Sequence, residues 1–588
     1  MDTITKLKNC RSKIDLALLL NCKPSHLTYL LYKQSPSQKY TQFSVNKKNG
    51  GIRNISAPIS QLKELQSNLS HLLLDCIDDI NATKSMKSTL SHGFVREKSI
   101  ITNAEMHKNT KNVLNIDLEN FFASFNFGRV RGFFISNNNF LLNKDIATVI
   151  AQIACHNNEL PQGSPCSPVI TNLITHSLDI RLANLAKKYS CTYSRYADDI
   201  TFSTRKTQFP KEIMCERENV FTPSRRLNGE IIRAGFKINP KKTRIQYKDS
   251  RQDVTGLIVN KKIGVKKEYR QITKSMCNSL FHSGGFTKLV DGKHEKGSIE
   301  ELEGRLNFID SIDLYNRLTF PEKLSIHYPH VKHGIKTKKL LTGRERTLSK
   351  FLFYKNFFAN EKPKILCEGK TDNIYLMAAL NNLSSNYPSL ASPATATKLF
   401  EPLVSFLNYS KRTKFLLELA GGTSYLVGFI LDYHKYYSFY KAEKSNNPVI
   451  IILDNDDGLG EVIKAIAKIK TCVVEAPVIA GQNINDQVKS SRFVHVCHNL
   501  YLVITPLDQG KDTMIENLFE PQLWATPIKG RTFDPTEKKK PTDNYYGKNI
   551  FATEVVNPKK GQINFDGFKP LFDRMVEVLE HYKVNRQP

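Results

Sequence analysis

The sequence lacks any apolar stretch long enough to cross a membrane. Its longest apolar runs, Ile14–Leu20 and Val449–Leu453, fall far short of the ~20 residues that a membrane helix needs. The 11 cysteines are scattered and form no CxxC pair, which argues against a zinc site and fits free thiols in a reducing compartment. The start, MDTITKLKNC, shows no apolar core of a secretory signal. We therefore expect a cytoplasmic protein with no membrane partner.

Acidic residues are scarce in the first 360 residues. This part holds 57 Lys and Arg against 31 Asp and Glu, a net charge of +26, whereas residues 361–588 hold 28 against 25. The excess is densest over residues 221–360, with 29 against 13. A basic segment of this size predicts a polyanionic partner, most often nucleic acid. The alternative, a solvated basic surface that only aids solubility, fits a localised surplus less well.

The order of the expected elements divides the chain. At roughly 100–200 residues per domain, a chain of this length predicts several domains. Apolar spacing and turn residues predict short helices over 1–40, a β-hairpin over 41–58, a helix over 59–80, alternating strands and helices to about 260, and basic, mostly helical residues to 360. From about 363, strands alternate with helices, which favours an α/β domain with a mostly parallel sheet.

Three aspartates stand at the ends of expected strands in the first half. Asp117 follows the apolar run NVLNID, and Asp198 and Asp199 form the turn of YSRYADDITFS. Nucleotidyl transfer uses two Mg²⁺ ions about 3.5–4 Å apart, and Mg²⁺ prefers carboxylate oxygens. A lone Asp-Asp pair is more often a solvated turn. Here, however, the Gly- and Pro-rich turn LPQGSPCSP leads into an apolar helix, and INPKKT follows the hairpin.

The order IDLENFF, LPQGSPCSP, YADD and AGFKINPKKT resembles the fingers and palm of reverse transcriptases, over roughly residues 15–320. The resemblance implies that the three aspartates are catalytic and bind two Mg²⁺ ions. It also implies a set of residues that contact the incoming nucleotide: Arg53, Phe122, Gln162, Gly163 and Lys241. Alternatives stay open at three places, with Lys47 or Lys48 beside Arg53, Phe121 in place of Phe122, and Lys242 in place of Lys241.

Two further patterns, NAEMH at 103–107 and DVTGLIVN at 253–260, resemble signatures of retron reverse transcriptases. The resemblance implies residues that hold structure or RNA rather than perform chemistry: Asn103, His107, Val254, Thr255 and Gly256. It further implies an enzyme that copies part of a structured noncoding RNA, from the 2′-OH of an internal guanosine, into branched RNA-linked DNA (msDNA). A group II intron reverse transcriptase is the alternative, but residues after 360 do not resemble a maturase domain or an HNH nuclease.

A second set of acidic residues lies in the tail. Glu368 in ILCEGKTD and Asp454 and Asp456 in IILDNDD each follow an expected strand, the usual site location in an open α/β sheet. These segments resemble a Toprim domain, above all that of overcoming-lysogenisation-defect family nucleases. The resemblance implies a Mg²⁺ or Mn²⁺ site with Asp372 and Glu516 as further ligands, and Lys548 as a catalytic cation. A folded but inactive docking module is the alternative.

We therefore expect a multidomain α/β and α+β fold, in which a right-hand-like polymerase precedes an α/β Toprim domain. The expected divisions are fingers and palm over 1–260, an RNA-binding thumb over 261–330, a basic linker over 331–362, and a Toprim nuclease-like domain over 363–588.

The expected function is that of a retron reverse transcriptase fused to a nuclease effector for antiphage defence. Its expected partners are the retron RNA and its msDNA, dNTPs and a nucleic-acid substrate of the tail, and a homo-oligomer stays open. The alternative is a group II intron-like or mobile-element reverse transcriptase with a non-catalytic Toprim scaffold.

Overall fold

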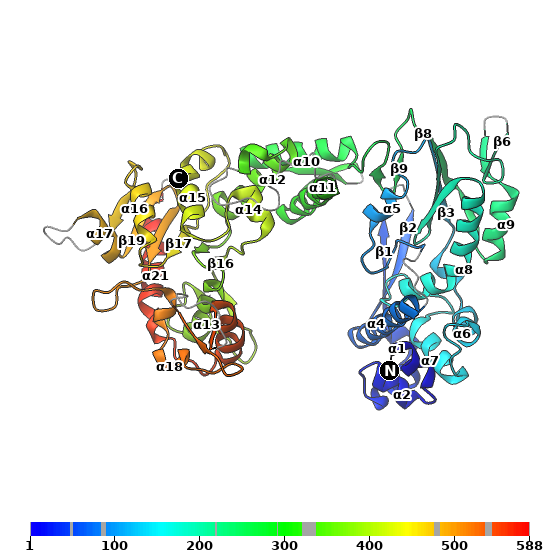
Figure 1. The fold of residues 1–588 in the computed structure, drawn as a ribbon, viewed down its shortest axis with the longest axis horizontal. Helices are drawn as coiled ribbons and strands as arrows, with labels where there is room; N and C mark the ends of the chain where they lie inside the picture. The colour runs from blue at the N-terminus through cyan, green and yellow to red at the C-terminus, as the bar shows by residue number, and fades with distance from the viewer. Residues whose placement is uncertain are drawn as a thin grey trace. The chain divides into compact units, whose positions relative to one another are not determined.

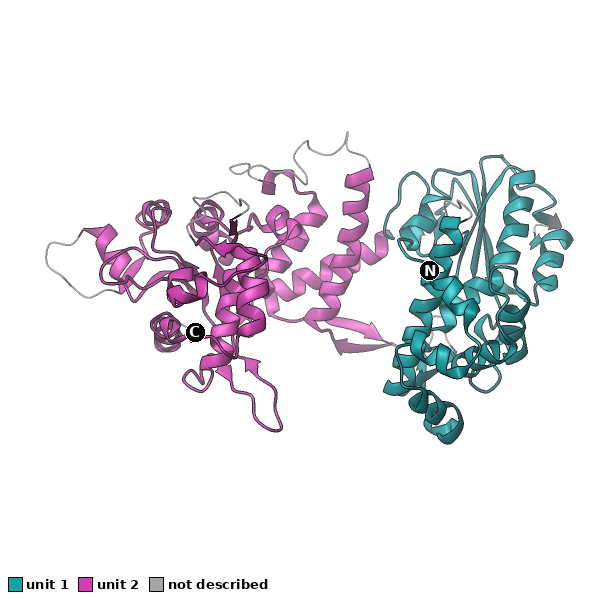
Figure 2. Ribbon diagram, turned by 60° about the horizontal axis from the view of Figure 1, so that its bottom comes forward, with its two compact units in different colours: residues 1–266 teal, residues 267–588 magenta. Residues whose placement is uncertain are grey.

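The chain divides into two compact units, Met1–Lys266 and Lys267–Pro588 (Figure 2). The computed structural model describes residues 2–46, 51–83, 90–217, 220–290, 292–319, 337–475, 483–535 and 544–586. Lys47 and Lys48, named above beside Arg53, lie outside the described residues. Within the described ranges, no helix combines the length and the apolar character needed to span a membrane.

The first unit is built around a four-stranded antiparallel sheet in the order β4-β5-β3-β8 (Figure 1). Its strands are β3 (Asn112–Leu118), β4 (Cys191–Tyr196), β5 (Asp199–Thr204) and β8 (Ile238–Tyr247). Nearly every side chain of β3 is buried, as expected for a central strand made of apolar residues. The long helix α8 (Ser167–Lys188) packs on β4 and joins the same core.

The segment before this sheet confirms the expected hairpin and helix. Strands β1 (Tyr40–Asn46) and β2 (Ile52–Pro58) pair antiparallel, and α4 (Ser60–Thr83) follows with one apolar face in the core. The other helices of the unit are α1 (Thr3–Asn9), α2 (Lys13–Leu19), α3 (Pro24–Thr28), α5 (Ile100–Glu105), α6 (Phe127–Ser136), α7 (Lys144–Ala154) and α9 (Arg225–Arg233). Two small hairpins complete it: β6 (Met214–Arg217) with β7 (Val220–Pro223), and β9 (Asp253–Val254) with β10 (Leu257–Ile258).

The second unit contains a six-stranded sheet in the order β16-β13-β17-β20-β19-β18. Its strands are β13 (Lys364–Cys367), β16 (Ser405–Phe406), β17 (Val449–Leu453), β18 (Val473–Glu475), β19 (Phe493–Cys497) and β20 (Leu500–Ile504). The first four in this order pair in parallel, and β19 and β18 run antiparallel at one edge. The mostly parallel sheet expected from the alternation of strands and helices is therefore present.

Helices cover both faces of this sheet. Alternate residues of β17 enter different cores: Val449 and Ile451 pack with α15 (Thr423–Tyr437) and α16 (Leu459–Ile466), whereas Ile450 packs with α13 (Asp372–Leu383) and α21 (Lys569–Asn585). Further short elements of this unit are α14 (Lys411–Leu417), α17 (Ile484–Ser490), α18 (Pro521–Trp524), α19 (Lys548–Ile550), α20 (Asn557–Lys559), β14 (Ala391–Ser392), β15 (Glu401–Pro402), β21 (Thr532–Phe533) and β22 (Tyr545–Tyr546).

The helices after residue 266, which include the expected thumb, pack within the second unit. They are α10 (Lys267–Ser283), α11 (Ile299–Thr319) and α12 (Gly343–Phe353), with the hairpin β11 (Thr287–Val290) and β12 (Lys293–Lys296) between the first two. Apolar residues of α10 and α11 share one hydrophobic core with α14 and α15. The division of the chain therefore falls after Lys266, and the expected thumb and tail form one folded unit.

The stretch over 331–362, expected as a basic linker, contains a folded helix in its described part. Helix α12 begins with a capping box, in which the Thr342 hydroxyl accepts from the Glu345 backbone N–H and the Glu345 carboxylate accepts from that of Thr342. Leu348 and Phe351 are buried on its inner face. A π-helical turn, Tyr354–Phe358, continues the helix and buries three more aromatic rings. Apolar residues at helical spacing explain why this basic stretch folds into the core.

Candidate active sites

A polar pocket of about 630 Å³ opens at the end of β3 in the first unit. The strand register sets Asp117 directly opposite Asp199 on β5, and the Leu118 backbone N–H donates to the Asp198 carbonyl at 3.1 Å. Both Asp117 and Asp198 line the pocket. The structure therefore brings the three sequence-predicted aspartates to one strand end.

The turn that carries Asp198 is held by a buried ion pair that the sequence did not reveal. Ala197 adopts a left-handed conformation with φ +55°, which sets up the tight reversal between β4 and β5. The Arg195 guanidinium donates to the Ala197 carbonyl at 2.9 Å and to both carboxylate oxygens of Asp179 at 2.7 Å. Tyr193 donates its hydroxyl to the same carboxylate at 2.6 Å. Arg195 is therefore a positioning residue for the Asp-Asp turn.

The carboxylates at this strand end repel one another electrostatically. Partial loss of water, followed by repulsion from Asp198 and Asp117, raises the pKa of Asp199 to about 7. Burial, followed by the charge of Asp117, raises the pKa of Asp198 as well. The Lys242 ammonium lies 2.9 Å from Asp117 Oδ2, and this contact raises the lysine pKa. Three crowded carboxylates with one lysine form a site with a surplus of negative charge, which favours a cation.

Three of the predicted nucleotide contacts line the same pocket: Arg53 on β2, Phe122 after β3, and Gln162. Phe121 is buried against Phe125 and Phe236, so it is the core residue of the pair, and Phe122 is only partly buried. Gly163 has φ +119°, and a Cβ there would lie 2.8 Å from the Ser56 carbonyl oxygen. Only glycine lets this loop approach β2 so closely.

The structure brings Lys242, and not Lys241, to the pocket. Lys242 contacts Asp117 and lines the cavity, whereas Lys241 is exposed and its backbone N–H donates to Asn239 Oδ1 at 3.2 Å. β8 bulges at this point, since Asn239 pairs with Asp117 and Arg244 pairs with Asn115, and within the bulge the side chain of Lys242 reaches the aspartates. Asn239 also belongs to the site, because its amide donates to Asp117 Oδ1 at 3.1 Å.

Asn103 and His107 lie inside the protein beneath the sheet and are fully buried. The His107 ring nitrogens lie 2.7 Å from the hydroxyls of Ser203 on β5 and Ser194 on β4. Ser194 in turn donates to Asn103 Oδ1 at 2.7 Å. Burial lowers the pKa of His107 to about 3, which keeps the ring neutral. The NAEMH pattern therefore ties α5 to the two strands that carry the Asp-Asp turn.

Val254, Thr255 and Gly256 form the tight hairpin between β9 and β10. Thr255 and Gly256 both have positive φ, +46° and +82°, which matches a two-residue type I′ turn. The Thr255 hydroxyl donates to the Ile100 carbonyl at 3.2 Å, and Val254 is fully buried. The hairpin therefore packs against α5.

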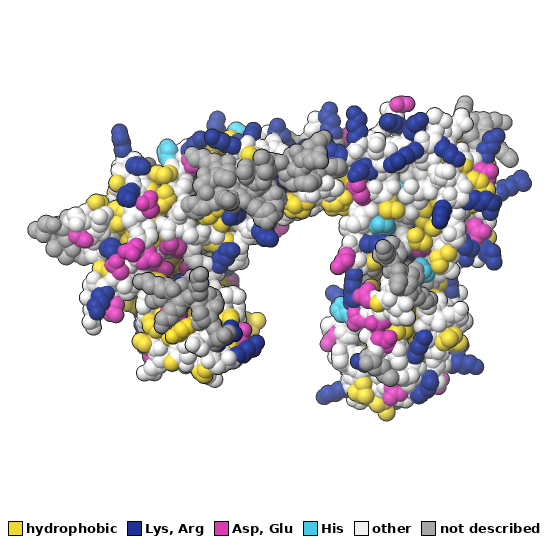
Figure 3. Space-filling model, viewed as in Figure 1, with side chains coloured by type: hydrophobic (Ala, Val, Ile, Leu, Met, Phe, Trp, Pro, Cys, Tyr) yellow, Lys and Arg dark blue, Asp and Glu magenta, His cyan; other side chains and the backbone are white. Residues whose placement is uncertain are grey.

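The second carboxylate set gathers at the carboxyl ends of two adjacent parallel strands. Glu368 directly follows β13, Asp454 directly follows β17, and the Asp454 N–H donates to Glu368 Oε2 at 3.4 Å. Thr423, at the start of α15, donates its hydroxyl to the other oxygen of Glu368. In Figure 3, a group of Asp and Glu side chains lies over the part of the second unit near β17.

Asp372, Glu516 and Lys548 complete this set. The Asp372 carboxylate accepts from the Gly369 N–H at 2.7 Å, and Asp454 Oδ1 accepts from the N–H of Ile515 at 2.8 Å, which brings the turn bearing Glu516 to the strand ends. Lys548 lies 3.1 Å from the fully buried Glu516.

Burial and repulsion shift the pKa of these groups. For Asp454, burial followed by repulsion from Asp372, Glu516 and Glu368 raises the pKa to about 8. Burial disfavours charge on Lys548, but Glu516, Asp454 and Asp372 outweigh it and raise the lysine pKa.

Asp456 lies at the edge of this set. Its carboxylate accepts from the Gly458 N–H at 2.8 Å, within its own turn before α16. It is close enough to Glu368 for its charge to contribute, after burial, to the raised pKa of that residue. The structure thus links each of the six predicted residues of the tail electrostatically to at least one other.

In the part of the chain that the structure describes, no group of three or more His, Cys, Asp or Glu side chains is placed so that it could hold a metal ion. The fit to a divalent cation rests on the donors: each set consists of carboxylates held at strand ends, and Mg²⁺ and Mn²⁺ prefer such oxygens. Burial, followed by repulsion from neighbouring carboxylates, raises the pKa of Asp199 and of Asp454.

Comparison with known proteins gives the family. Residues 45–259 match the family model described as "Reverse transcriptase (RNA-dependent DNA polymerase)". The retron Ec86 reverse transcriptase of Escherichia coli is 33% identical over 296 residues, which cover 49% of this chain and 82% of that protein. The chain belongs to the retron reverse transcriptase family. Two relatives from Myxococcus xanthus, the retron Mx65 and Mx162 reverse transcriptases, are each 31% identical over 302 and 318 residues.

The alignments cover only part of this chain and part of each relative. The alignments span 48% and 51% of this chain and 62% and 63% of the two Myxococcus xanthus proteins, so the chain covers less than two thirds of their lengths. Among solved structures, telomerase from Candida albicans aligns with 53% of this chain and 59% of its own at 11% identity. The TM-score of 0.29 is too low to indicate a shared fold. The family model ends at residue 259, before the second carboxylate set.

Proposed function

We propose that the chain is an RNA-directed DNA polymerase that copies part of a structured noncoding RNA into msDNA. The observation that carries the proposal is a pocket of a retron reverse transcriptase family member lined by Asp117, Asp198, Arg53 and Phe122, with Asp199 paired to Asp117 across the strands. The excess of Lys and Arg in the first 360 residues supports a nucleic-acid template.

The residues of the pocket divide the work. The three aspartates would hold two Mg²⁺ ions, which when bound supply an activated attacking hydroxyl and neutralise the triphosphate. Arg53 would grip the triphosphate, because a guanidinium binds phosphate oxygens in pairs. Phe122 presents an aromatic face beneath the sugar of the incoming dNTP. Lys242 keeps the Asp117 carboxylate in place beside the turn.

For the tail, the proposal is a Toprim nuclease effector that hydrolyses phosphodiester bonds. Glu368, Asp454 and Asp456, with Asp372 and Glu516, would hold Mg²⁺ or Mn²⁺, which when bound polarises the phosphate. Lys548 would stabilise the negative charge that develops on the phosphate. The wider proposal is antiphage defence, in which the RNA–msDNA complex restrains the effector until infection disturbs it.

The polymerase proposal is tested with the full chain expressed beside its neighbouring noncoding RNA. Co-purified nucleic acid is sequenced, and extension with dNTPs and Mg²⁺ is measured for wild type, the double variant D198N/D199N and the control D249N. Asp249 is an exposed aspartate outside the pocket, in the turn after β8. Branched DNA and extension are expected for wild type and D249N only. Linear cDNA without a branch would instead support a mobile-element polymerase, and activity in D198N/D199N would refute the assigned site.

The nuclease proposal is tested separately, because the two carboxylate sets belong to different units. Cleavage of RNA and DNA with Mg²⁺ or Mn²⁺ is compared for wild type, D454N and the control D457N, whose exposed carboxylate adjoins the set without a contact to Glu368. Cleavage in wild type and D457N, and its loss in D454N with msDNA intact, is expected. Equal absence of cleavage in all three would support a non-catalytic scaffold.

A further inference from the structure

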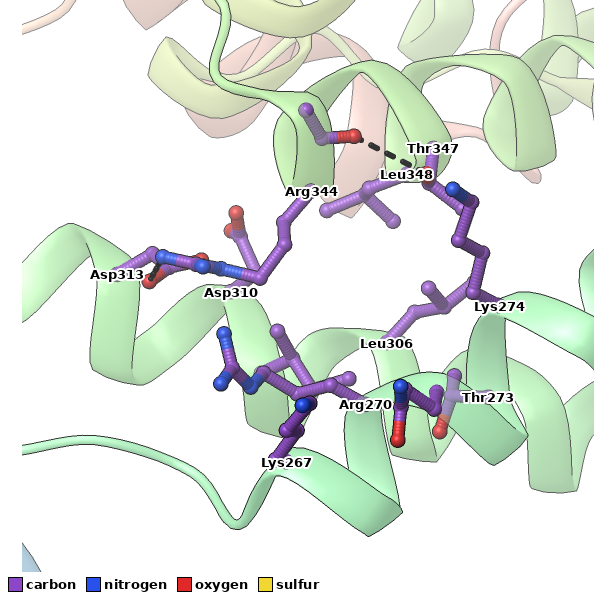
Figure 4. Close-up of a pocket in the computed structure, with 13 residues that line it drawn as sticks. Lys267, Arg270, Thr273, Lys274, Leu306, Asp310, Asp313, Arg344, Thr347 and Leu348 are labelled. Atoms are coloured by element: carbon purple, nitrogen blue, oxygen red, sulfur yellow. Dashed lines mark hydrogen bonds and ion pairs between the residues drawn. The ribbon is translucent and has the colours of Figure 1, made fainter. Parts of the chain in front are cut away.

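A cavity of about 410 Å³ lies among the three helices α10, α11 and α12 of the second unit (Figure 4). Its volume falls in the range of about 300–1,000 Å³ that small-molecule sites usually occupy. Lys267, Arg270 and Lys274 line it from α10, and Arg344 and Leu348 line it from α12 on the opposite side. Neither carboxylate set contributes a residue to it.

The acidic residues in the lining are already neutralised. The Arg344 guanidinium donates through Nε and Nη2 to the two oxygens of Asp313, each at 2.5 Å. Arg412, on α14, binds Asp310 in the same two-pronged manner, with Nε 2.7 Å from Oδ2. Because each aspartate is already paired with an arginine, neither compensates the positive charge of the α10 side chains.

Three cations of α10 line the cavity. Lys267, Arg270 and Lys274 follow one another at i, i+3 and i+7, so they share one face of the helix and repel one another. Among the residues that the structure describes, none of the three has an ion-pair partner. The Nε–H of Arg270 is buried and finds no hydrogen-bond acceptor there. A buried donor without a partner is costly, and an anion in the cavity would satisfy it.

The rest of the lining is apolar. Leu306 and Ile309 on α11 and Leu348 on α12 are all buried and form the floor of the cavity. A free phosphate or sulfate would leave this floor uncovered. A ligand that combines an anionic group with a planar, weakly polar body covers the floor and also reaches the cations. Nucleoside phosphates have that combination: a guanidinium matches the phosphate, and a base can pack against apolar side chains.

We propose that this cavity is a second nucleotide site, which binds a nucleoside phosphate by Arg270, Lys267 and Lys274 and its base on Leu306, Ile309 and Leu348. The nucleotide is either free in solution or one unit of a bound strand that turns its base into the cavity. The ion pairs of Asp310 and Asp313 adjoin it and join α11 to α12 and α14. Occupancy is therefore coupled to the packing of helices that share a core with the tail.

The test uses the full chain in EDTA, so that nucleotide binding through Mg²⁺ at the polymerase pocket is suppressed. Binding of AMP, GMP, CMP, UMP and inorganic phosphate is titrated, and 8-azido-AMP is photo-crosslinked and its peptides are identified by mass spectrometry. A second arm crosslinks an RNA oligonucleotide that carries 5-iodouridine. The variants are Arg270→Gln and Lys274→Gln, and the matched control is Arg346→Gln, an exposed arginine of α12 outside the cavity.

The expected result is labelling within residues 267–274 or 343–348, and binding weakened about tenfold or more by Arg270→Gln but not by Arg346→Gln. Labelling by 8-azido-AMP identifies a free nucleotide, and labelling by the oligonucleotide alone identifies a strand. If Arg270→Gln and Arg346→Gln weakened nucleotide binding equally, the binding would be non-specific attraction to surface charge, and the proposal would be overturned. So would phosphate binding as tightly as the mononucleotides, or label only in other peptides. Arg53→Ala should leave this binding unchanged, which separates it from the polymerase pocket.

Discussion

Replacing Asp179 by alanine should destabilise the first unit strongly. The Arg195 and Asp179 side chains are 0% and 1% exposed and form two hydrogen bonds of 2.7 Å. The variant leaves the guanidinium buried without a counter-charge, and breaking a buried pair in this way costs about 3–5 kcal/mol. Domains usually have only about 5–15 kcal/mol of stability, so the free energy of unfolding of this unit should fall by a large fraction.

The chain allows the effect to be localised. Its single tryptophan, Trp524, lies in the second unit, so tryptophan fluorescence reports unfolding there while far-UV circular dichroism reports both units. In a urea titration, Asp179→Ala should move the dichroism transition of the first unit to lower urea and leave the fluorescence midpoint in place. A shift worth less than about 0.5 kcal/mol, the size of an ordinary surface substitution, would refute the reasoning.

A double variant separates stability from positioning. Asp179→Leu with Arg195→Met removes both charges and fills similar volume, so it should recover part of the lost stability, although the buried Tyr193 hydroxyl then lacks its acceptor. It also removes the donor to the Ala197 carbonyl, which is 2.9 Å away in the wild-type chain. Primer extension should therefore stay low although the protein is folded. Full activity in the double variant would show that Arg195 does not position the Asp-Asp turn.

Three further outcomes are expected. Lys242→Gln should slow nucleotide addition by about tenfold or more, since it removes a charged contact to the catalytic carboxylates, whereas Lys241→Gln should change the rate little in the same primer-extension assay. Gly163→Ala should cost about 1–3 kcal/mol in urea denaturation and raise the KM for dNTPs, because its φ of +119° and the 2.8 Å approach of its Cβ to the Ser56 carbonyl are both strained. Burial lowers the pKa of His107 to about 3 from 6.5, so between these pH values this ring takes up a proton in the unfolded chain but not in the folded one. Stability should then fall by up to about 1.4 kcal/mol per pH unit as the pH drops from 6.5 toward 3, and His107→Gln should remove that part of the slope in urea titrations.

Local pattern predicted much of the fold. The β1–β2 hairpin and α4 follow from alternation, turn residues and helical spacing, and each lies where the sequence indicated. The positions of Asp117, Glu368 and Asp454 at strand ends follow in the same way, because each comes directly after or within the last residues of an apolar run. Such features depend on neighbours within a few residues, and a sequence displays them directly.

Features that depend on distant packing were beyond the sequence. Asp179 on α8 and Arg195 on β4 are 16 residues apart, and only the packing of helix on strand makes them partners. The choice between Lys241 and Lys242 depends on the bulge of β8 opposite Ile116, which only the pairing with β3 sets. A basic composition suggested a linker where α12 is buried, because charge on the outer face of a helix says nothing about what its inner face covers.

The shared core after Lys266 has a consequence for how such a chain can be recombined. Apolar residues of α10 and α11 pack in one cluster with those of α14, α15 and β17. A hybrid joined at 362/363 would divide that cluster, so buried residues of one protein would have to pack against those of another. A hybrid joined at 266/267 would move a complete folding unit.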